Sequence, residues 1–257
     1  MAERERRPER EHRTERERPS ARERITTPHD PLTSLVLTIP VFVVYHLGIL
    51  FMDLRNGADL VTGLALRVLD YGVEAYVALT LGVAVGIAAV AWALRGAGAT
   101  LRASTLVPIL VESCVWALVA MIGVGWATQE LFANAALAPL QLGPRALGPL
   151  EKLVMACGAG FHEELLFRVV LFGGIAWVMR RFWIPAIVAV PVAAVVSSLA
   201  FSAVHYVGAL GDSFTLVSFT FRALMGLFLA FLFKARGFAV AVYTHVIYDL
   251  LVFFVFG

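Results

Sequence analysis

Two carboxylates and a guanidinium lie inside an apolar stretch of the sequence, at Glu163, Glu164 and Arg168. The stretch is long enough to cross a bilayer, where each charge near the centre costs about 2.5–3.5 kcal/mol, so the three groups are expected to face other helices rather than lipid. On a helix, Glu164 and Arg168 are four residues apart and can form an ion pair. Glu163 points about 100° away and is left free for another partner. The two glutamates are therefore expected to differ in role.

Two later apolar stretches each carry a pair of residues at the same four-residue spacing, Phe201 with His205 and His245 with Asp249. Each pair lies on one helix face, so three helices can converge on one polar pocket. In a cavity of low dielectric constant, a carboxylate beside an imidazole can take a proton from water near neutral pH, which is the work of a general base. A second imidazole could stabilise the oxyanion that forms when water attacks an amide carbonyl.

Other interpretations of these residues remain open. An intramembrane Glu–Arg pair can simply fix helix packing, and a membrane histidine can simply be hydrogen-bonded. The helical zinc-protease motif is excluded, because Leu166 stands where the second histidine ligand would follow His162 and Glu163. A metal held by His205, His245 and a carboxylate remains possible by ligand type. Three motifs on separate helices favour function, since intramembrane ionisable groups are usually functional.

Three more polar residues in apolar stretches are predicted to be structural. His162 is next to Glu163 but outside the paired positions, so it is expected to pack or to support the site. His46 and Glu112 each stand alone in an early apolar stretch and are interpreted as structural.

The elements that must position these residues are membrane helices. Hydrophobic residues make up 60% of the chain and the mean hydropathy is +0.80, whereas soluble globular chains are roughly 45–50% apolar. A spanning helix needs about 20 mostly apolar residues. The sequence therefore predicts an all-α, polytopic transmembrane bundle of about seven spans. The predicted stretches are 32–52, 71–94, 105–129, 150–179, 184–206, 216–233 and 238–256.

The fourth stretch is longer than a bilayer requires. It is expected to tilt, to kink near Gly158 and Gly160, or to begin with a surface section before Glu151.

Residues 1–31 differ from the rest of the chain, because they mix Arg, Glu and Pro with almost no apolar residues and cannot bury a core. We expect a disordered cytoplasmic tail there and a transmembrane domain over 32–257. Basic residues in alternate connections place the amino terminus inside. Abundant Arg, Ala, Val and Gly are typical of proteins from GC-rich bacterial genomes, so we expect a bacterial cell membrane. The inner connections hold Arg95, Arg102, Arg180, Arg181, Lys234 and Arg236.

Composition argues against two classes of protein. The net charge of +2 gives no reason to expect nucleic acid as a partner. Cys114 and Cys157 both lie in apolar stretches, where they behave as small hydrophobic residues and form neither a metal-ligand pair nor a disulfide framework.

Together, the three motifs resemble the CAAX protease and bacteriocin-processing family of intramembrane proteases, also called the ABI family. That family shows Glu-Glu-x-x-x-Arg, then Phe-x-x-x-His, then His-x-x-x-Asn or Asp, in this order on separate helices. The resemblance covers roughly residues 150–250, which would form the catalytic core. The stretch Arg222 to Gly226 and the turn Ala235-Arg236-Gly237 are also similar.

The resemblance implies hydrolysis of a peptide bond within the membrane. Glu163 and His205 would activate water, and Glu164 with Arg168 would hold the architecture. His245 and Asp249 would face the carbonyl oxygen. The family often has Gly where Val169 and Ser202 stand here, and its best-known members have Asn in place of Asp249. An ionised Asp cannot donate to an oxyanion, so this residue would instead orient His245 or stay protonated.

The leading hypothesis is therefore an intramembrane endopeptidase acting on a membrane-associated or prenylated-type peptide or protein. Its partners would be the bilayer and that substrate. It would require no cofactor, with a divalent zinc ion as an open alternative. A second hypothesis is a non-proteolytic peptide-binding scaffold or bacteriocin self-immunity protein of the same fold. A third is a proton-coupled transporter, against which the sequence shows no obvious inverted repeat with paired broken helices.

Overall fold

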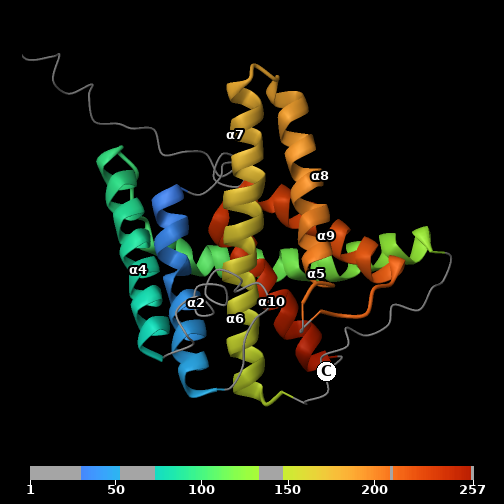
Figure 1. Ribbon diagram of the computed structural model, residues 1–257, viewed down its shortest axis with the longest axis horizontal. Helices are drawn as coiled ribbons and strands as arrows, with labels where there is room; N and C mark the ends of the chain where they lie inside the picture. Colours follow the sequence, from blue (N-terminus) through green and yellow to red (C-terminus); the bar gives the residue numbers. More distant parts are fainter. Residues whose placement is uncertain (1–29, 53–72, 133–146, 209–210, 256–257) are drawn as a thin grey trace, which may run out of the picture.

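The computed structural model describes residues 30–52, 73–132, 147–208 and 211–255, and all regular structure within these ranges is helical. The predicted tail, apart from Asp30 and Pro31, lies outside the described residues. The chain is a polytopic all-α bundle, as predicted (Figure 1). Its helices are α2 (Pro31–Phe51), α4 (Val73–Gly96), η2 (Ala103–Thr105), α5 (Leu106–Leu131), α6 (Pro149–Glu164), η3 (Leu165–Gly173), α7 (Gly174–Arg181), α8 (Ala186–Val204), α9 (Leu216–Arg236) and α10 (Phe238–Val255).

Helix ends follow local sequence signals. At the start of α2 the Asp30 carboxylate accepts a hydrogen bond from Leu32 N at 2.9 Å, and Pro31 occupies the first turn, where its missing N–H is no loss. At the end of α9, Gly237 adopts φ 99°, a left-handed conformation that favours glycine, and α10 begins at the next residue, Phe238. Two long helices are thereby joined by one residue.

Six helical stretches in the described part of the chain are long and apolar enough to cross a membrane. They correspond to six of the seven predicted stretches, and most boundaries agree to within about two or three residues. The remaining predicted stretch, 150–179, is the helix formed by α6, η3 and α7, which contains Glu163, Glu164 and Arg168 and so differs from the others in composition. The six are Pro31–Phe51, Glu74–Gly96, Ala103–Leu131, Ala186–Val204, Leu216–Arg236 and Phe238–Val255.

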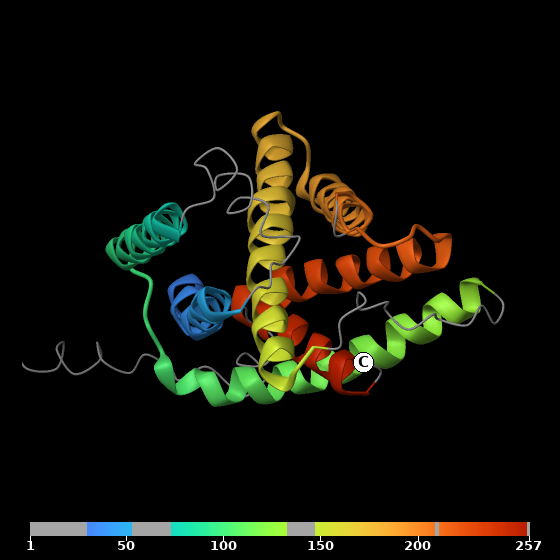
Figure 2. The ribbon, with the colours of Figure 1, turned by 60° about the horizontal axis from the view of Figure 1, so that its bottom comes forward.

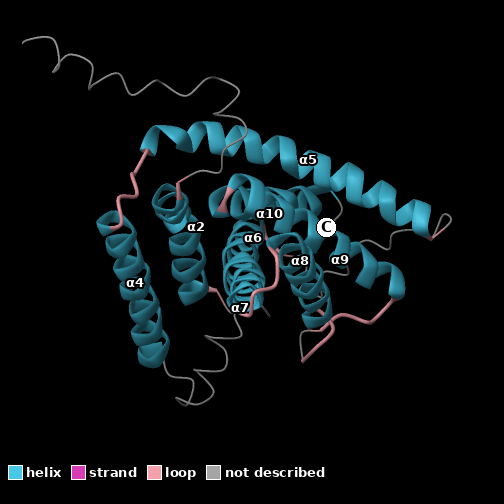
Figure 3. Cartoon of the chain, turned by 90° about the horizontal axis from the view of Figure 1, so that it is seen from above, coloured by secondary structure: helices cyan, strands magenta, loops and turns pink. Residues whose placement is uncertain are grey.

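The helix formed by α6, η3 and α7 runs through the middle of the molecule (Figure 2). Helices α2 and α4 lie on one side of it, and α8 and α9 lie on the other. Helix α5 runs across the other helices along one edge of the bundle (Figure 3). Helix α10 packs against α2, α5, α6 and α9, so it is the most central of the later helices.

The kink expected near Gly158 and Gly160 is not there. Both glycines lie within regular α-helix, and the departure from α-helical geometry occurs later, where η3 forms a π-helix over Leu165–Gly173. The glycines serve close packing instead, because a Cβ at Gly158 would overlap the ring of Tyr45 and one at Gly160 would overlap Val246. Small residues that let backbones approach closely are typical of membrane helix interfaces.

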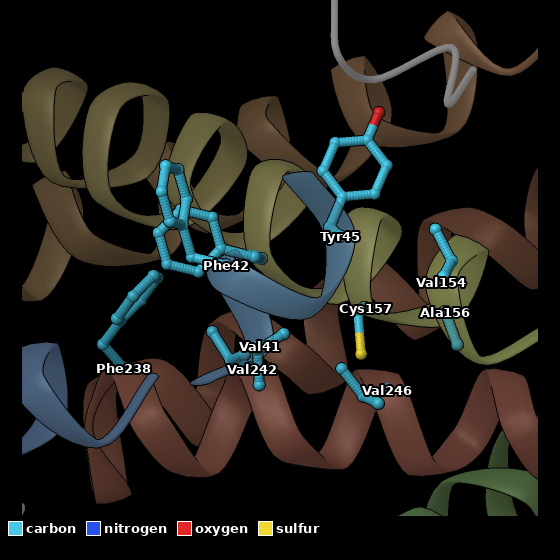
Figure 4. Packing of buried hydrophobic residues seen from close by; sticks show 10 residues of the cluster. Val41, Phe42, Tyr45, Val154, Ala156, Cys157, Phe238, Val242 and Val246 are labelled. Atoms are coloured by element: carbon cyan, nitrogen blue, oxygen red, sulfur yellow. The ribbon is translucent and has the colours of Figure 1, made fainter. Parts of the chain in front are cut away.

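One core cluster joins α2, α6 and α10 (Figure 4). Phe42 of α2 packs edge-on against Phe161 of α6, with ring centroids 5.2 Å apart. Tyr243 of α10 also donates a hydrogen bond to the carbonyl of Leu37 at 2.7 Å. These contacts hold α2 against α6 and α10, the helices that carry Glu163, Glu164, His245 and Asp249. The cluster comprises Val41, Phe42, Tyr45, Val154, Ala156, Cys157, Phe161, Phe238, Val242 and Val246.

Candidate active site

The six residues singled out from the sequence lie together where three helical segments meet. Glu163 and Glu164 are the last residues of α6, and Arg168 follows in η3. His205 caps the carboxyl end of α8, and both His245 and Asp249 lie within α10. Residues 86 positions apart in the sequence thus form one polar cluster inside apolar helices.

The first part of the cluster is a fully buried ion pair. Arg168 Nε lies 3.0 Å from Glu164 Oε2, and both side chains have 0% exposure. The guanidinium carbon also lies 4.8 Å from the ring centroid of Phe201. The nitrogens of Arg168 make no hydrogen bond to any residue that the structure describes, so Glu164 supplies the main compensation for this buried charge. The pairing matches the one that the four-residue spacing predicts.

Glu164 has a second partner that the sequence did not indicate. Its Oε1 accepts a hydrogen bond from His245 Nδ1 at 2.9 Å. Because a carboxylate accepts, Nδ1 carries the proton and the ring is fixed with Nε2 toward the centre of the cluster. Asp249 Oδ2 lies 3.7 Å from His245 Nε2, beyond hydrogen-bond distance. It is Glu164, not Asp249, that orients His245 in this structure.

Glu163 lies between the two imidazoles. Its Oε2 is 3.9 Å from His205 Nε2 and 3.8 Å from His245 Nε2, while its side chain is only 7% exposed. Within the described ranges this oxygen has no hydrogen-bond partner. Glu163 therefore faces away from Arg168, as the helix geometry predicts, and its carboxylate is the least constrained of the neighbouring pair.

His205 presents a defined nitrogen to Glu163. Its Nδ1 lies 2.7 Å from the carbonyl oxygen of Phe201, and a carbonyl only accepts, so Nδ1 carries a proton. In the neutral ring, Nε2 is then an acceptor that faces the acceptor oxygen of Glu163. Two acceptors at 3.9 Å call for a donor between them, and a water molecule can donate to both. His205 is also the most exposed member, at 24%, so the cluster is most open at this edge.

A bound metal ion would require several ligand atoms at short distances from one point. Zinc is held by nitrogen and oxygen ligands at about 2.0–2.2 Å, usually by three or four protein groups. Among the residues that the structure describes, no group of three or more His, Cys, Asp or Glu side chains is placed to hold a metal ion.

A second polar chain lies next to the cluster and joins three helices. His162 Nε2 lies 3.2 Å from His46 Nε2, and His46 Nδ1 is hydrogen-bonded to the hydroxyl of Tyr76 on α4. His162 Nδ1 donates to the carbonyl of Gly158 at 3.0 Å. With neutral rings, His46 then donates to His162, and Tyr76 donates to His46. His46 is thus not isolated, and its partner directly precedes Glu163.

Another cluster, which sequence analysis missed, holds the chain just after His205. Asp212 forms an ion pair with Arg222 of α9, and Asp212 N donates to the His205 carbonyl at 2.8 Å. The available signal was Arg222, a cation inside an apolar stretch.

Glu112, also interpreted as isolated, has partners of its own. It accepts two hydrogen bonds from Arg236, with Nε at 2.5 Å and Nη2 at 3.0 Å. Arg236, assigned to an inner connection, in fact lies in the last turn of α9 and is buried.

The carboxyl-terminal part of the chain matches a known protein family. Residues 146–251 match the family described as type II CAAX prenyl endopeptidase Rce1-like. The match covers all six residues of the cluster and confirms the resemblance indicated by the three motifs. Comparisons with curated proteins and with solved structures gave no match. With its six apolar helices, the chain is an integral membrane protein whose carboxyl-terminal part is similar to CAAX-type intramembrane endopeptidases.

Proposed function

We propose that the chain is an intramembrane endopeptidase in which Glu163 and His205 activate a water molecule for attack on a peptide bond. The observation that carries this proposal is the opposition of two acceptors, Glu163 Oε2 and His205 Nε2, 3.9 Å apart. The tautomer of His205 follows from its contact with the Phe201 carbonyl. A water that donates to both groups has its lone pairs free to attack a carbonyl carbon.

Hydrolysis adds the elements of water across the C–N bond, and Glu163 carries one proton from the water to the leaving nitrogen. Glu163 takes a proton from the water as the water oxygen bonds to the carbonyl carbon. The carbonyl oxygen becomes an oxyanion in a tetrahedral intermediate. As the C–N bond breaks, the protonated Glu163 gives its proton to the leaving nitrogen, so the products are a carboxylic acid, which then ionises, and an amine. His205 keeps the water in place by accepting its second hydrogen.

His245 is the proposed donor to the oxyanion. Its Nδ1–H is already donated to Glu164, so a donor at Nε2 requires the imidazolium form. The cluster contains three carboxylates, and among the described residues Arg168 is the guanidinium that pairs with one of them, so a positive His245 brings the local charge closer to neutral. Asp249, 3.7 Å from Nε2, compensates this charge and need not itself donate. This assigns a role to an aspartate where the family's best-known members have asparagine.

The family match and the position of the cluster support the proposed substrate class. A site enclosed by apolar helices suits a substrate that reaches it from the membrane, such as a peptide with an attached isoprenoid. The test uses the full chain, purified in detergent and reconstituted in liposomes. The substrate is a fluorogenic peptide with S-farnesyl cysteine followed by three residues, and an unprenylated copy serves as the control.

The expected result is cleavage by the wild-type protein, preference for the prenylated peptide, and loss of cleavage in Glu163→Ala and His205→Ala. Equal cleavage rates for wild type and Glu163→Ala would overturn the mechanism. If these variants also kept the biological effect of the wild-type protein in cells, the non-proteolytic, peptide-binding alternative would replace it.

A further inference from the structure

The chain on both sides of His205 is bound to the first two turns of α9 by three contacts. Ser202, in the last turn of α8, donates to the carbonyl of Phe219 at 2.7 Å. Tyr206, the residue after His205, donates to the hydroxyl of Ser218 at 2.9 Å. Asp212 forms an ion pair with Arg222. His205 lies between the first and second of these contacts.

Arg222 connects the second and third of these contacts, because it binds both Ser218 and Asp212. One end of its guanidinium binds Asp212, and Nη1 donates to Ser218 at 3.0 Å. The guanidinium carbon also lies 5.1 Å from the ring centroid of Tyr206. Asp212 in turn donates its backbone N–H to the His205 carbonyl at 2.8 Å. The Arg222 side chain therefore contacts Tyr206, the residue after His205, and Asp212, whose N–H closes the turn.

We propose that Arg222 and Asp212 are positioning residues that hold the imidazole of His205 against Glu163. The proposal rests on the proposed function for its catalytic consequence. His205 is the C-cap residue, one position beyond the end of α8 at Val204, and its side chain is partly exposed. Its Nδ1 donates to the Phe201 carbonyl of α8, but the turn that carries its backbone is held from α9 through Asp212 and Arg222. The nearest reacting partner lies on a different helix, at 3.9 Å, and a small shift of the turn would open that gap.

The ion pair is asymmetric in burial, which allows the two charges to be tested separately. The Arg222 side chain is 8% exposed, whereas that of Asp212 is 32% exposed. Asp212 can be solvated if Arg222 is removed, but Arg222 cannot be solvated if Asp212 is neutralised. Arg222→Gln is therefore the variant that keeps the fold, and Asp212→Asn is the more disruptive one. Ser218→Ala, which removes only a hydroxyl, is a milder second test.

The first measurement is steady-state kinetics on the farnesylated peptide in liposomes. Arg222→Gln is expected to lower kcat about 10- to 100-fold with KM within about twofold, the scale of removing a group that orients an active residue. Ser218→Ala should change kcat in the same direction by less. The control Arg180→Gln, at an exposed position in the last turn of α7, should match wild type. A wild-type kcat in both Arg222→Gln and Ser218→Ala would overturn the proposal.

The second measurement does not depend on catalysis, so it separates this inference from the proposed function. Diethyl pyrocarbonate acylates neutral imidazoles, and peptide mass spectrometry resolves each site. In Arg222→Gln the labelling rate of His205, relative to His162 of the same molecule, is expected to rise several-fold, and in Arg180→Gln it should not change. If the wild-type protein cleaves nothing, the proposed function fails, but a raised labelling rate still supports the positioning role. An unchanged labelling rate in a folded Arg222→Gln protein overturns it.

Discussion

Replacing Glu164 with Gln tests the division of labour between the two adjacent glutamates. Glu164 Oε2 lies 3.0 Å from Arg168 Nε with both side chains fully buried, and Oε1 accepts from His245. With an effective dielectric constant of 20, two unit charges at 3.0 Å attract by about 5.5 kcal/mol. Neutralising one partner leaves Arg168 buried without its counter-charge, and such changes cost about 3–5 kcal/mol. We expect Glu164→Gln to lose that much stability.

The matched variant is Glu163→Gln, one residue away and of the same shape. Glu163 Oε2 makes no hydrogen bond to the described residues and lies 3.9 and 3.8 Å from the two imidazoles, so its loss should change stability by less than about 1 kcal/mol. Its loss should nevertheless lower kcat about 10²- to 10⁴-fold, because the general base is gone.

The assay is unfolding of both variants by SDS titration in mixed micelles, together with peptide cleavage before the transition. The expected pattern is a stable but inactive Glu163→Gln and a clearly destabilised Glu164→Gln. Equal unfolding midpoints for wild type and Glu164→Gln would refute the stabilising role of the ion pair between Glu164 and Arg168. Equal destabilisation by both substitutions would refute the separation of roles.

Three further predictions concern Asp249, Gly160 and metal dependence. Asp249→Asn should retain cleavage to within about tenfold, since Glu164 keeps His245 oriented, whereas inactivity comparable to that of Glu163→Ala would show that Asp249 takes part directly in the reaction. Gly160→Leu should destabilise the protein by about 1–3 kcal/mol or more, because its Cβ would overlap Val246 and lie 3.1 Å from α10 backbone; Gly82→Leu, with open space around it, is the control in the same unfolding assay. Cleavage by protein freed of metal should survive a chelator; complete loss that zinc restores would refute the metal-free mechanism.

Much of the fold could be predicted because its signals are local. The length of the apolar stretches identified the membrane helices. The four-residue spacing placed Glu164 beside Arg168, and it placed His245 on the same helix face as Asp249. The cost of a charge in lipid required that these faces turn inward. Helix geometry alone also turned Glu163 away from Arg168.

The remaining features depend on how helices sit against one another. The hydrogen bond between Glu164 and His245 joins residues 81 positions apart, and no spacing rule relates them. The contact between His162 and His46 likewise depends on the rotation of α2 relative to α6. Gly158 and Gly160 were mistaken for a kink because glycine weakens a helix but also admits a neighbour, and the sequence of one helix does not show which applies.

The same packing explains why only one of two neighbouring carboxylates is suited to act on water. Both oxygens of Glu164 are engaged, one by His245 and one by Arg168, so accepting a proton would sacrifice two strong interactions. The Oε2 of Glu163 is as deeply enclosed but meets its partners only at 3.8 and 3.9 Å. A proton placed there sacrifices little, and it relieves the cost of a buried charge. Of the two glutamates, the one that the fold leaves less satisfied is therefore the one better able to take a proton from water and return it.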